Sequence, residues 1–220
     1  MSNKKETIRL WLDAYPSLHN YSNTKLYSIL GPFVIGIELI KLPRVDNYRP
    51  HFVLYPLYCN NLKTCLSYPI FLLEFFNKKG LEYSIPYNMD DKSLFNDVKN
   101  SINNKISKEV GKDMPISTIF KLIDEQIGSH ITKLQLKQPE FYEVKYYSAL
   151  YVSNDKANTV LEEIQKEHKS WDMNKFNTYY GDYNEWYDSL KGKDRNSFLK
   201  LINKNKSDEK LGKLNQSELV

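Results

Sequence analysis

Phe33–Leu42 (FVIGIELIKL) and Phe52–Tyr58 (FVLYPLY) decide the fold of this chain, because each is a nearly continuous apolar run. Runs of this kind are typical of strands that are buried on both faces of a sheet. The loop between them, residues 43–50, contains two prolines and an Asp-Asn pair, so we expect the strands to pair antiparallel. Pro56 has no N–H for the ladder, which places it at a sheet edge or a bulge.

Two further strands are predicted on either side of a helical region. Residues 81–86 (LEYSIP) alternate in hydropathy, and residues 141–152 (FYEVKYYSALYV) are rich in aromatic and branched side chains. The expected sheet therefore has strands near residues 33–42, 51–58, 81–86 and 141–152.

Helices are predicted where apolar residues recur every three or four positions. The strongest patterns cover residues 94–106, with Asp90 or Asp91 as the cap, and residues 116–127. Weaker patterns predict helices at residues 6–15, 24–30, 67–79, 154–164, 186–190 and 198–202. We therefore expect an α+β fold, in which a small antiparallel sheet packs against several helices.

The length and composition of the chain favour a single α+β domain over residues 1–202. Residues 203–220 contain little that could be buried, so we expect a disordered polar tail. No apolar stretch is long enough for a membrane span, and the amino terminus lacks the pattern of a signal peptide. The sequence thus predicts a soluble cytoplasmic protein without membrane contact, in a bacterial or phage style.

The basic charge is concentrated near the carboxyl terminus. The segment from Arg195 onward holds six basic and three acidic residues, which gives +3 of the formal net charge of +4 and leaves +1 for the rest. Binding to a duplex needs clustered Lys and Arg, so a nucleic-acid partner is disfavoured.

Glu38 is the one acidic residue inside the first apolar run. A buried carboxylate must be paired or protonated, so Glu38 is either a general base or cation anchor, or a structural partner of Arg44, Arg49 or His51. A position on an exposed rim of the strand is a further alternative.

Glu143 and Lys145 form an E-x-K pattern on the predicted strand 141–152. On a strand the two side chains share a face, which is how metal-dependent nucleases hold a divalent ion. Glu140 or Glu38 would be the further acid. The alternative is a solvated strand face, because E-x-K is frequent by chance.

Two cysteines and one histidine are candidate zinc ligands. Cys59 and Cys65 with His51 fit no standard ligand spacing, so we interpret both cysteines as free thiols and predict neither a metal nor a cofactor. Glycine-rich phosphate loops and a nucleophile elbow are absent from the sequence, which disfavours nucleotide hydrolysis and serine hydrolysis.

A dense aromatic cluster follows residue 170. Its rings are interleaved with acidic residues in the segment Tyr179, Tyr180, Asp182, Tyr183, Glu185, Trp186, Tyr187 and Asp188, with Trp171 and Phe176 before it. Such rings either cap the core or anchor a protein interface, whereas the acids would repel a phosphate backbone.

These features predict a non-enzymatic protein that binds another macromolecule. The specific hypothesis is an immunity-type or anti-defence inhibitor whose segment 179–188 covers a cationic toxin or defence enzyme. The E-x-K nuclease is the alternative. The sequence does not indicate an oligomeric state.

Overall fold

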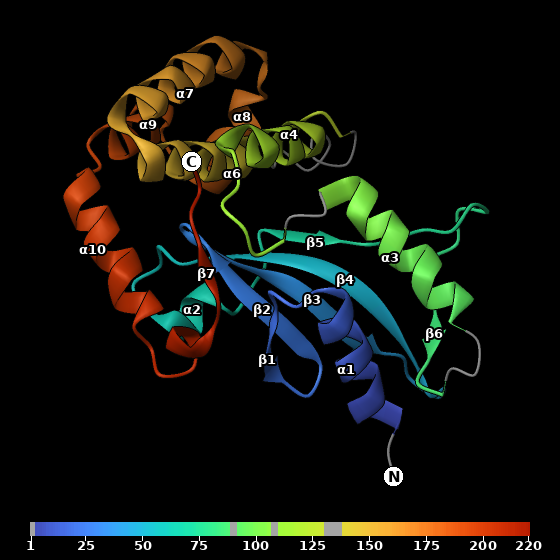
Figure 1. The fold of residues 1–220 in the computed structure, drawn as a ribbon. Coiled ribbons are helices and arrows are strands. Elements are labelled where there is room, and N and C mark those ends of the chain that lie inside the picture. Colours follow the sequence, from blue (N-terminus) through green and yellow to red (C-terminus); the bar gives the residue numbers. More distant parts are fainter. Residues whose placement is uncertain (1–2, 89–91, 107–109, 130–137) are drawn as a thin grey trace. The chain divides into compact units, whose positions relative to one another are not determined.

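The computed structural model has an α+β fold, as the sequence predicts (Figure 1). The structure describes residues 3–88, 92–106, 110–129 and 138–220. The predicted cap at Asp90 or Asp91 lies outside this part of the chain. Within it, no helix combines the length and the apolar character that crossing a membrane requires.

Two compact units are distinguished, where the sequence predicts one domain over residues 1–202. The first consists of residues 1–113 with 202–218, and the second of residues 114–201 with 219–220. The first contains the sheet, and the second is helical.

The sheet has five consecutive strands and two additions. In order across the sheet the strands are β1 (His19–Ser22), β2 (Lys25–Leu30), β3 (Phe33–Lys41), β4 (Asn47–Pro56) and β5 (Phe71–Leu73). β6 (Ile85–Pro86) pairs with β4, and β7 (Gln216–Ser217) runs parallel to β2. The other pairings are antiparallel, which confirms the two core strands and their predicted relation.

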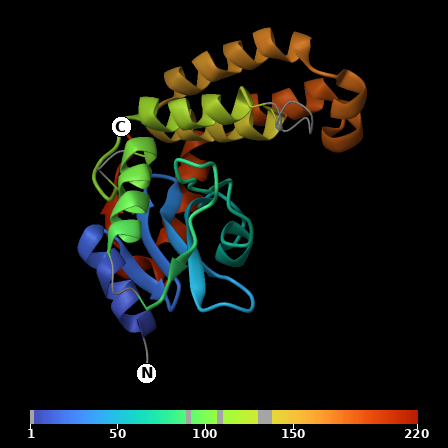
Figure 2. The same cartoon turned by 90° about the vertical axis from the view of Figure 1, so that its right-hand side faces the viewer.

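One face of the sheet carries an apolar row that belongs to the core of the first unit. Paired residues form an apolar row across four strands, from Leu26 through Ile37 and Phe52 to Leu73. The helices α1 (Asn3–Ala14) and α3 (Ser93–Ile106) lie on one side of the sheet (Figure 2). Trp11 of α1 is fully buried; its Nε1 donates a hydrogen bond of 3.0 Å to the hydroxyl of Tyr48 on β4.

Three local predictions for the first unit are wrong or only partly right. Residues 25–30 within the predicted helix 24–30 form β2, and residues 71–73 within the predicted helix 67–79 form β5. Pairing with β3 and β4 outweighs the weak helical spacing at these sites. The strand predicted at residues 81–86 is reduced to β6 and an isolated bridge between Phe76 and Glu82. The short helix α2 (Leu62–Cys65) was not predicted.

The second unit is built from helices. In chain order these are α4 (Ile116–Ile127), α6 (Gln138–Val152), α7 (Asn154–Glu167), the 3-10 turn η1 (His168–Ser170), α8 (Met173–Tyr180), α9 (Tyr183–Lys191) and the start of α10 (Arg195–Lys206). The strand predicted at residues 141–152 is therefore wrong, because this segment belongs to α6.

The helix α6 is held by contacts along its length. Its residues are buried on nearly every side, which removes the polar stripe that would mark a helix in the sequence. The guanidinium of Arg195 donates to the carbonyls of Leu150, Tyr151 and Val152 at distances of 2.7–3.0 Å. These carbonyls have no partner inside the helix, so Arg195 caps the carboxyl end of α6.

Residues 203–220 are structured, in contrast to the predicted disordered tail. They include the end of α10, the 3-10 turn η2 (Leu211–Lys213) and β7. Leu211 is fully buried, and the Ser217 hydroxyl donates to the carbonyl of Ile29 at 3.0 Å. A few buried residues and backbone pairing with β2 therefore order a segment whose average composition is polar.

Candidate functional site

A polar row crosses the second face of the sheet. Lys25 on β2 is paired with Glu38 on β3, and Glu38 is paired with His51 on β4. Residues paired across antiparallel strands point to the same face, so these three side chains lie next to one another. The apolar row lies one residue away along each strand, and it faces the opposite side because successive side chains of a strand alternate between the two faces.

Glu38 is 6% exposed and fully partnered. Its carboxylate forms an ion pair of 3.0 Å with Lys25 and accepts hydrogen bonds from the hydroxyls of Tyr27 and, at 2.8 Å, Tyr55. Burial, followed by Glu38, raises the pKa of both tyrosines, so both remain donors at neutral pH. Of the sequence alternatives, the structural ion pair is the one found, with Lys25 in place of Arg44, Arg49 or His51.

Tyr27 reaches Glu38 because its strand partner is a glycine. A Cβ atom on Gly36 would lie 2.7 Å from Cδ1 of the Tyr27 ring. Because Gly36 has no side chain, the Tyr27 ring can lie over its backbone. A cavity of about 720 Å³, lined in part by Lys25, Tyr27 and α2, opens beside the network.

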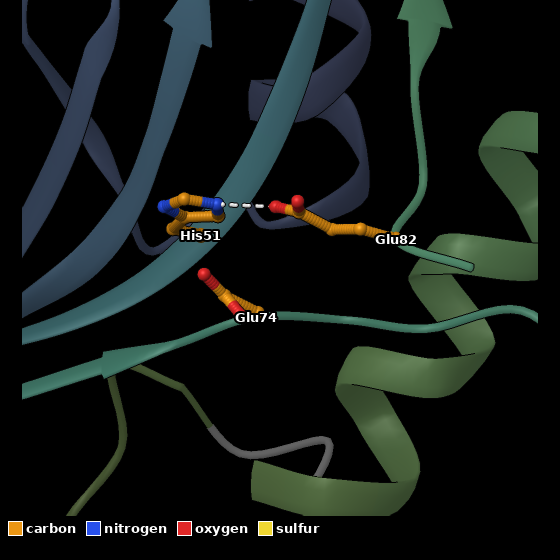
Figure 3. A group of neighbouring side chains, drawn as sticks. All are labelled: His51, Glu74 and Glu82. Carbon is orange, nitrogen blue, oxygen red and sulfur yellow. Dashed lines mark hydrogen bonds and ion pairs between the residues drawn. The ribbon is translucent and has the colours of Figure 1, made fainter. Parts of the chain in front are cut away.

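The polar row continues beyond His51 to two glutamates. Ligand atoms of His51, Glu74 and Glu82 all lie within 4.8 Å of one another (Figure 3). Nε2 of His51 and Oε1 of Glu82 are 2.8 Å apart, and the second oxygen of Glu82 pairs with Arg49 at 2.5 Å. His51 is buried and Glu74 is exposed, so the group reaches from the sheet to the surface. Among the described residues this is the one group of three metal-ligating side chains that meets this distance.

Cys59 and Cys65 are free thiols in the structure, as the sequence predicts, and they are not part of that group. Asn205 lies beside them: its amide donates to the carbonyl of Cys59 at 2.8 Å and contacts Sγ of Cys65 at 3.5 Å. The hydrogen bond from Cys59 is the main cause that lowers the pKa of Cys65 to about 7, and the same interaction raises the pKa of Cys59.

Both thiols are expected to react slowly in the folded protein. Reaction needs an accessible thiolate, but Cys65 is fully buried and the more accessible Cys59 has the raised pKa. We expect 5,5′-dithiobis(2-nitrobenzoate) at pH 7 to label the native chain roughly tenfold more slowly than a free cysteine. In urea, both thiols of each chain should react. Rapid labelling of Cys65 without urea would contradict its burial.

Glu143 and Lys145 do not form the arrangement that the nuclease hypothesis needs. They lie on the helix α6, where residues two positions apart point in different directions. Lys145, 5% exposed, pairs with Asp124 at 2.8 Å and Glu163 at 2.7 Å and so joins α4, α6 and α7. Burial lowers its pKa, but the two carboxylates outweigh that effect and the net pKa is raised.

Glu143 has a separate environment on the same helix. Its carboxylate accepts a hydrogen bond from Nε1 of Trp186, and burial raises its pKa. Glu140 is on α6 as well, but Glu38 belongs to the other compact unit. The described geometry therefore gives Glu143, Glu38 and Lys145 structural partners.

The aromatic cluster after residue 170 divides into an interior and a surface part. Trp171, Phe176 and Trp186 are buried, with Phe176 and Trp186 in an edge-on contact at 5.5 Å. These rings form core beneath α8 and α9. Trp186, which the sequence places in the partner-binding segment, is therefore a core residue.

The surface part is named here the α8–α9 surface and consists of Tyr179, Tyr180, Asp182, Tyr183, Glu185, Tyr187 and Asp188. Tyr179 is 71% exposed, and the other three tyrosines are partly exposed. The Tyr183 ring is stacked on His168 at 4.2 Å and on Tyr187 at 5.9 Å. The three acids are exposed, and Asp182 also caps α9 by accepting from the N–H groups of Asn184 and Glu185.

The carboxylates lie close enough to the rings to affect them. Burial, then Asp188 and Glu162, raises the pKa of Tyr187. Burial, then Glu140 and Glu143, raises the pKa of Tyr180 to about 12. Among the acids of the α8–α9 surface, Asp188 therefore acts on a neighbouring ring, that of Tyr187.

Comparisons with models of protein families, with curated proteins and with solved structures find no match to this chain.

Proposed function

We propose that this protein is a non-enzymatic binding protein that holds a cationic protein partner against the α8–α9 surface. The observation that carries the proposal is the ring of Tyr179, 71% exposed on the same short helix pair as the exposed Asp182, Glu185 and Asp188. Tyrosine gives a large contact area with little loss of side-chain entropy, and it is frequent among the residues that dominate binding energy.

The chemistry of this surface favours a basic partner. Carboxylates attract Lys and Arg, and the faces of the tyrosine rings attract the same cations. A phosphate backbone would be repelled, so nucleic acid is disfavoured as the occupant. An immunity-type or anti-defence inhibitor, which covers a basic toxin or defence enzyme, is the function that fits these properties.

Copurification from the native host, with a tagged full-length chain, tests the proposal. The test variant combines Tyr179→Ser with Asp188→Lys, both at exposed positions. The matched control combines Tyr68→Ser with Glu209→Lys, which also exchanges one exposed tyrosine and one exposed acid, but in the first unit. The partner is identified by mass spectrometry, and its affinity is then measured with purified proteins.

We expect a basic partner that the control variant retains and that the test variant binds about 10- to 30-fold more weakly, as for an interface with one dominant tyrosine. Equal binding by both variants, or a partner without a basic surface, would refute this use of the α8–α9 surface. Hydrogen exchange of both variants confirms that neither change unfolds its unit.

A further inference from the structure

The His51, Glu74 and Glu82 group lies at an interruption in the pairing of β4. On one edge of β4, Tyr48 pairs with Ile85 of β6, and Phe52 pairs with Leu73 of β5. The segment between β5 and β6 leaves the sheet opposite residues 49–51, where the two ladders leave a gap. His51 is thus a central strand residue beside the point at which the chain departs and returns.

The departing segment is a hairpin that brings the two glutamates together. Phe76 and Glu82 are bridged, and the N–H of Tyr83 donates to the carbonyl of Phe75 at 3.0 Å. Asn77 closes the turn, since its side chain accepts from the N–H groups of Lys79 and Leu81. Glu74 continues the register in which Val53 faces Leu72, which places it beside His51.

The charges of this group favour a bound cation. Arg49 holds one oxygen of Glu82 and leaves the other oxygen directed at Nε2 of His51. Glu74 has no ion pair in the described part of the chain, so two carboxylates lie close together and one of them, that of Glu82, is paired with a guanidinium. The other nitrogen of His51, Nδ1, is buried without a hydrogen-bond partner among the described residues. The interaction with Glu82 is therefore the one that orients the ring.

We propose that His51, Glu74 and Glu82 bind a divalent transition-metal ion, with Zn²⁺ as the reference cation. One imidazole nitrogen and two carboxylate oxygens are a donor set that zinc accepts, at about 2.0–2.2 Å from each. Tetrahedral bonds of that length separate the donors by about 3.4 Å, so Nε2 and Oε1 need to move apart by about 0.6 Å.

Three protein ligands leave a fourth position open to solvent on the exposed side of Glu74. Arg49 has the role of a positioning residue, because its ion pair fixes the orientation of the Glu82 carboxylate. The site lies in the first unit and is independent of the α8–α9 surface, so either proposal can fail without the other.

Isothermal titration calorimetry of the full-length chain with ZnCl₂, after removal of metal with a chelator, tests the site. We expect one ion per chain. Glu74→Gln is the first variant, because this residue is exposed and the change leaves the fold intact. It should weaken binding about tenfold or more, and His51→Gln should do the same. Glu209→Gln, at another exposed carboxylate of the first unit, should bind as the parent does.

Cobalt substitution separates this site from the two thiols. Co²⁺ bound to nitrogen and oxygen ligands shows weak visible bands and no thiolate charge-transfer band, and the double variant Cys59→Ala/Cys65→Ala should give the same spectrum. Loss of binding in that double variant would overturn the proposal. So would the absence of a binding isotherm for the parent chain, or equal affinities in the parent, Glu74→Gln and His51→Gln.

Discussion

Replacing Glu38 with alanine is expected to lower the free energy of unfolding of the sheet unit by about 4 kcal/mol. The carboxylate is 6% exposed and is the acceptor for the Tyr27 and Tyr55 hydroxyls as well as the partner of Lys25. Without it, two buried hydroxyls lose their acceptor and a cavity remains. Urea denaturation followed by circular dichroism measures the loss, and hydrogen exchange assigns it to β2–β4.

A double-mutant cycle distinguishes this network from a general effect on the strand. Tyr55→Phe alone is expected to cost about 1 kcal/mol, because it removes one hydrogen bond to the carboxylate. In the Glu38→Ala background the same change should be close to neutral, since the hydroxyl no longer has an acceptor. Glu74→Ala, at an exposed carboxylate, is the control and should change stability by less than about 0.5 kcal/mol. Additive effects of the two changes would contradict the network.

The core strands were predictable because their signal is local. Most residues of β3 and β4 are buried, and an apolar run records that burial directly. The same holds for α3 and α4, whose buried residues recur with helical spacing. Where the buried residues of an element form one long apolar run or recur with helical spacing, the sequence therefore predicts the element.

The helix α6 shows why the remaining elements were missed. Pro139, Phe141, Tyr142, Val144, Lys145, Tyr146, Ser148, Ala149 and Leu150 are all buried, so polar and apolar positions do not alternate with a helical period. Aromatic and branched residues then predict a strand, and only the 15-residue length favours a helix. Packing on several sides overrides the local preference.

The candidate site depends on register, which the sequence does not specify. Glu38 stands out in its run, but its partner Lys25 lies on β2, a segment with weak helical spacing. Nearness in sequence groups His51 with the cysteines, whereas in the structure the hairpin after β5 brings Glu74 and Glu82 to it. Lys25 and Tyr27 are two positions apart, so on a strand their side chains share one face. If residues 25–30 are assigned to a strand next to β3, this spacing predicts that both side chains lie near Glu38.

Replacing Trp186 with alanine is expected to destabilise the helical unit by about 4 kcal/mol. The side chain is 8% exposed, packs against Trp171 and Phe176, and donates a hydrogen bond to Glu143. Tyr179→Ala, on the neighbouring helix, should change stability by less than about 0.5 kcal/mol. Urea denaturation followed by circular dichroism compares the two variants; similar small losses in both would show that Trp186 is a surface residue.

The loss caused by Trp186→Ala should depend on pH through Glu143. Burial raises the folded-state pKa of this carboxyl above its ordinary value, and the Trp186 hydrogen bond opposes that shift. The protonated Glu143 carboxyl therefore contributes to the free energy of unfolding at low pH, and this contribution is lost as the pH rises through the pKa of the folded state. Removal of the indole raises that pKa further, so the difference from the parent should be larger at pH 7 than at pH 4. In a Glu143→Gln background this pH dependence should disappear, because the titrating group is gone.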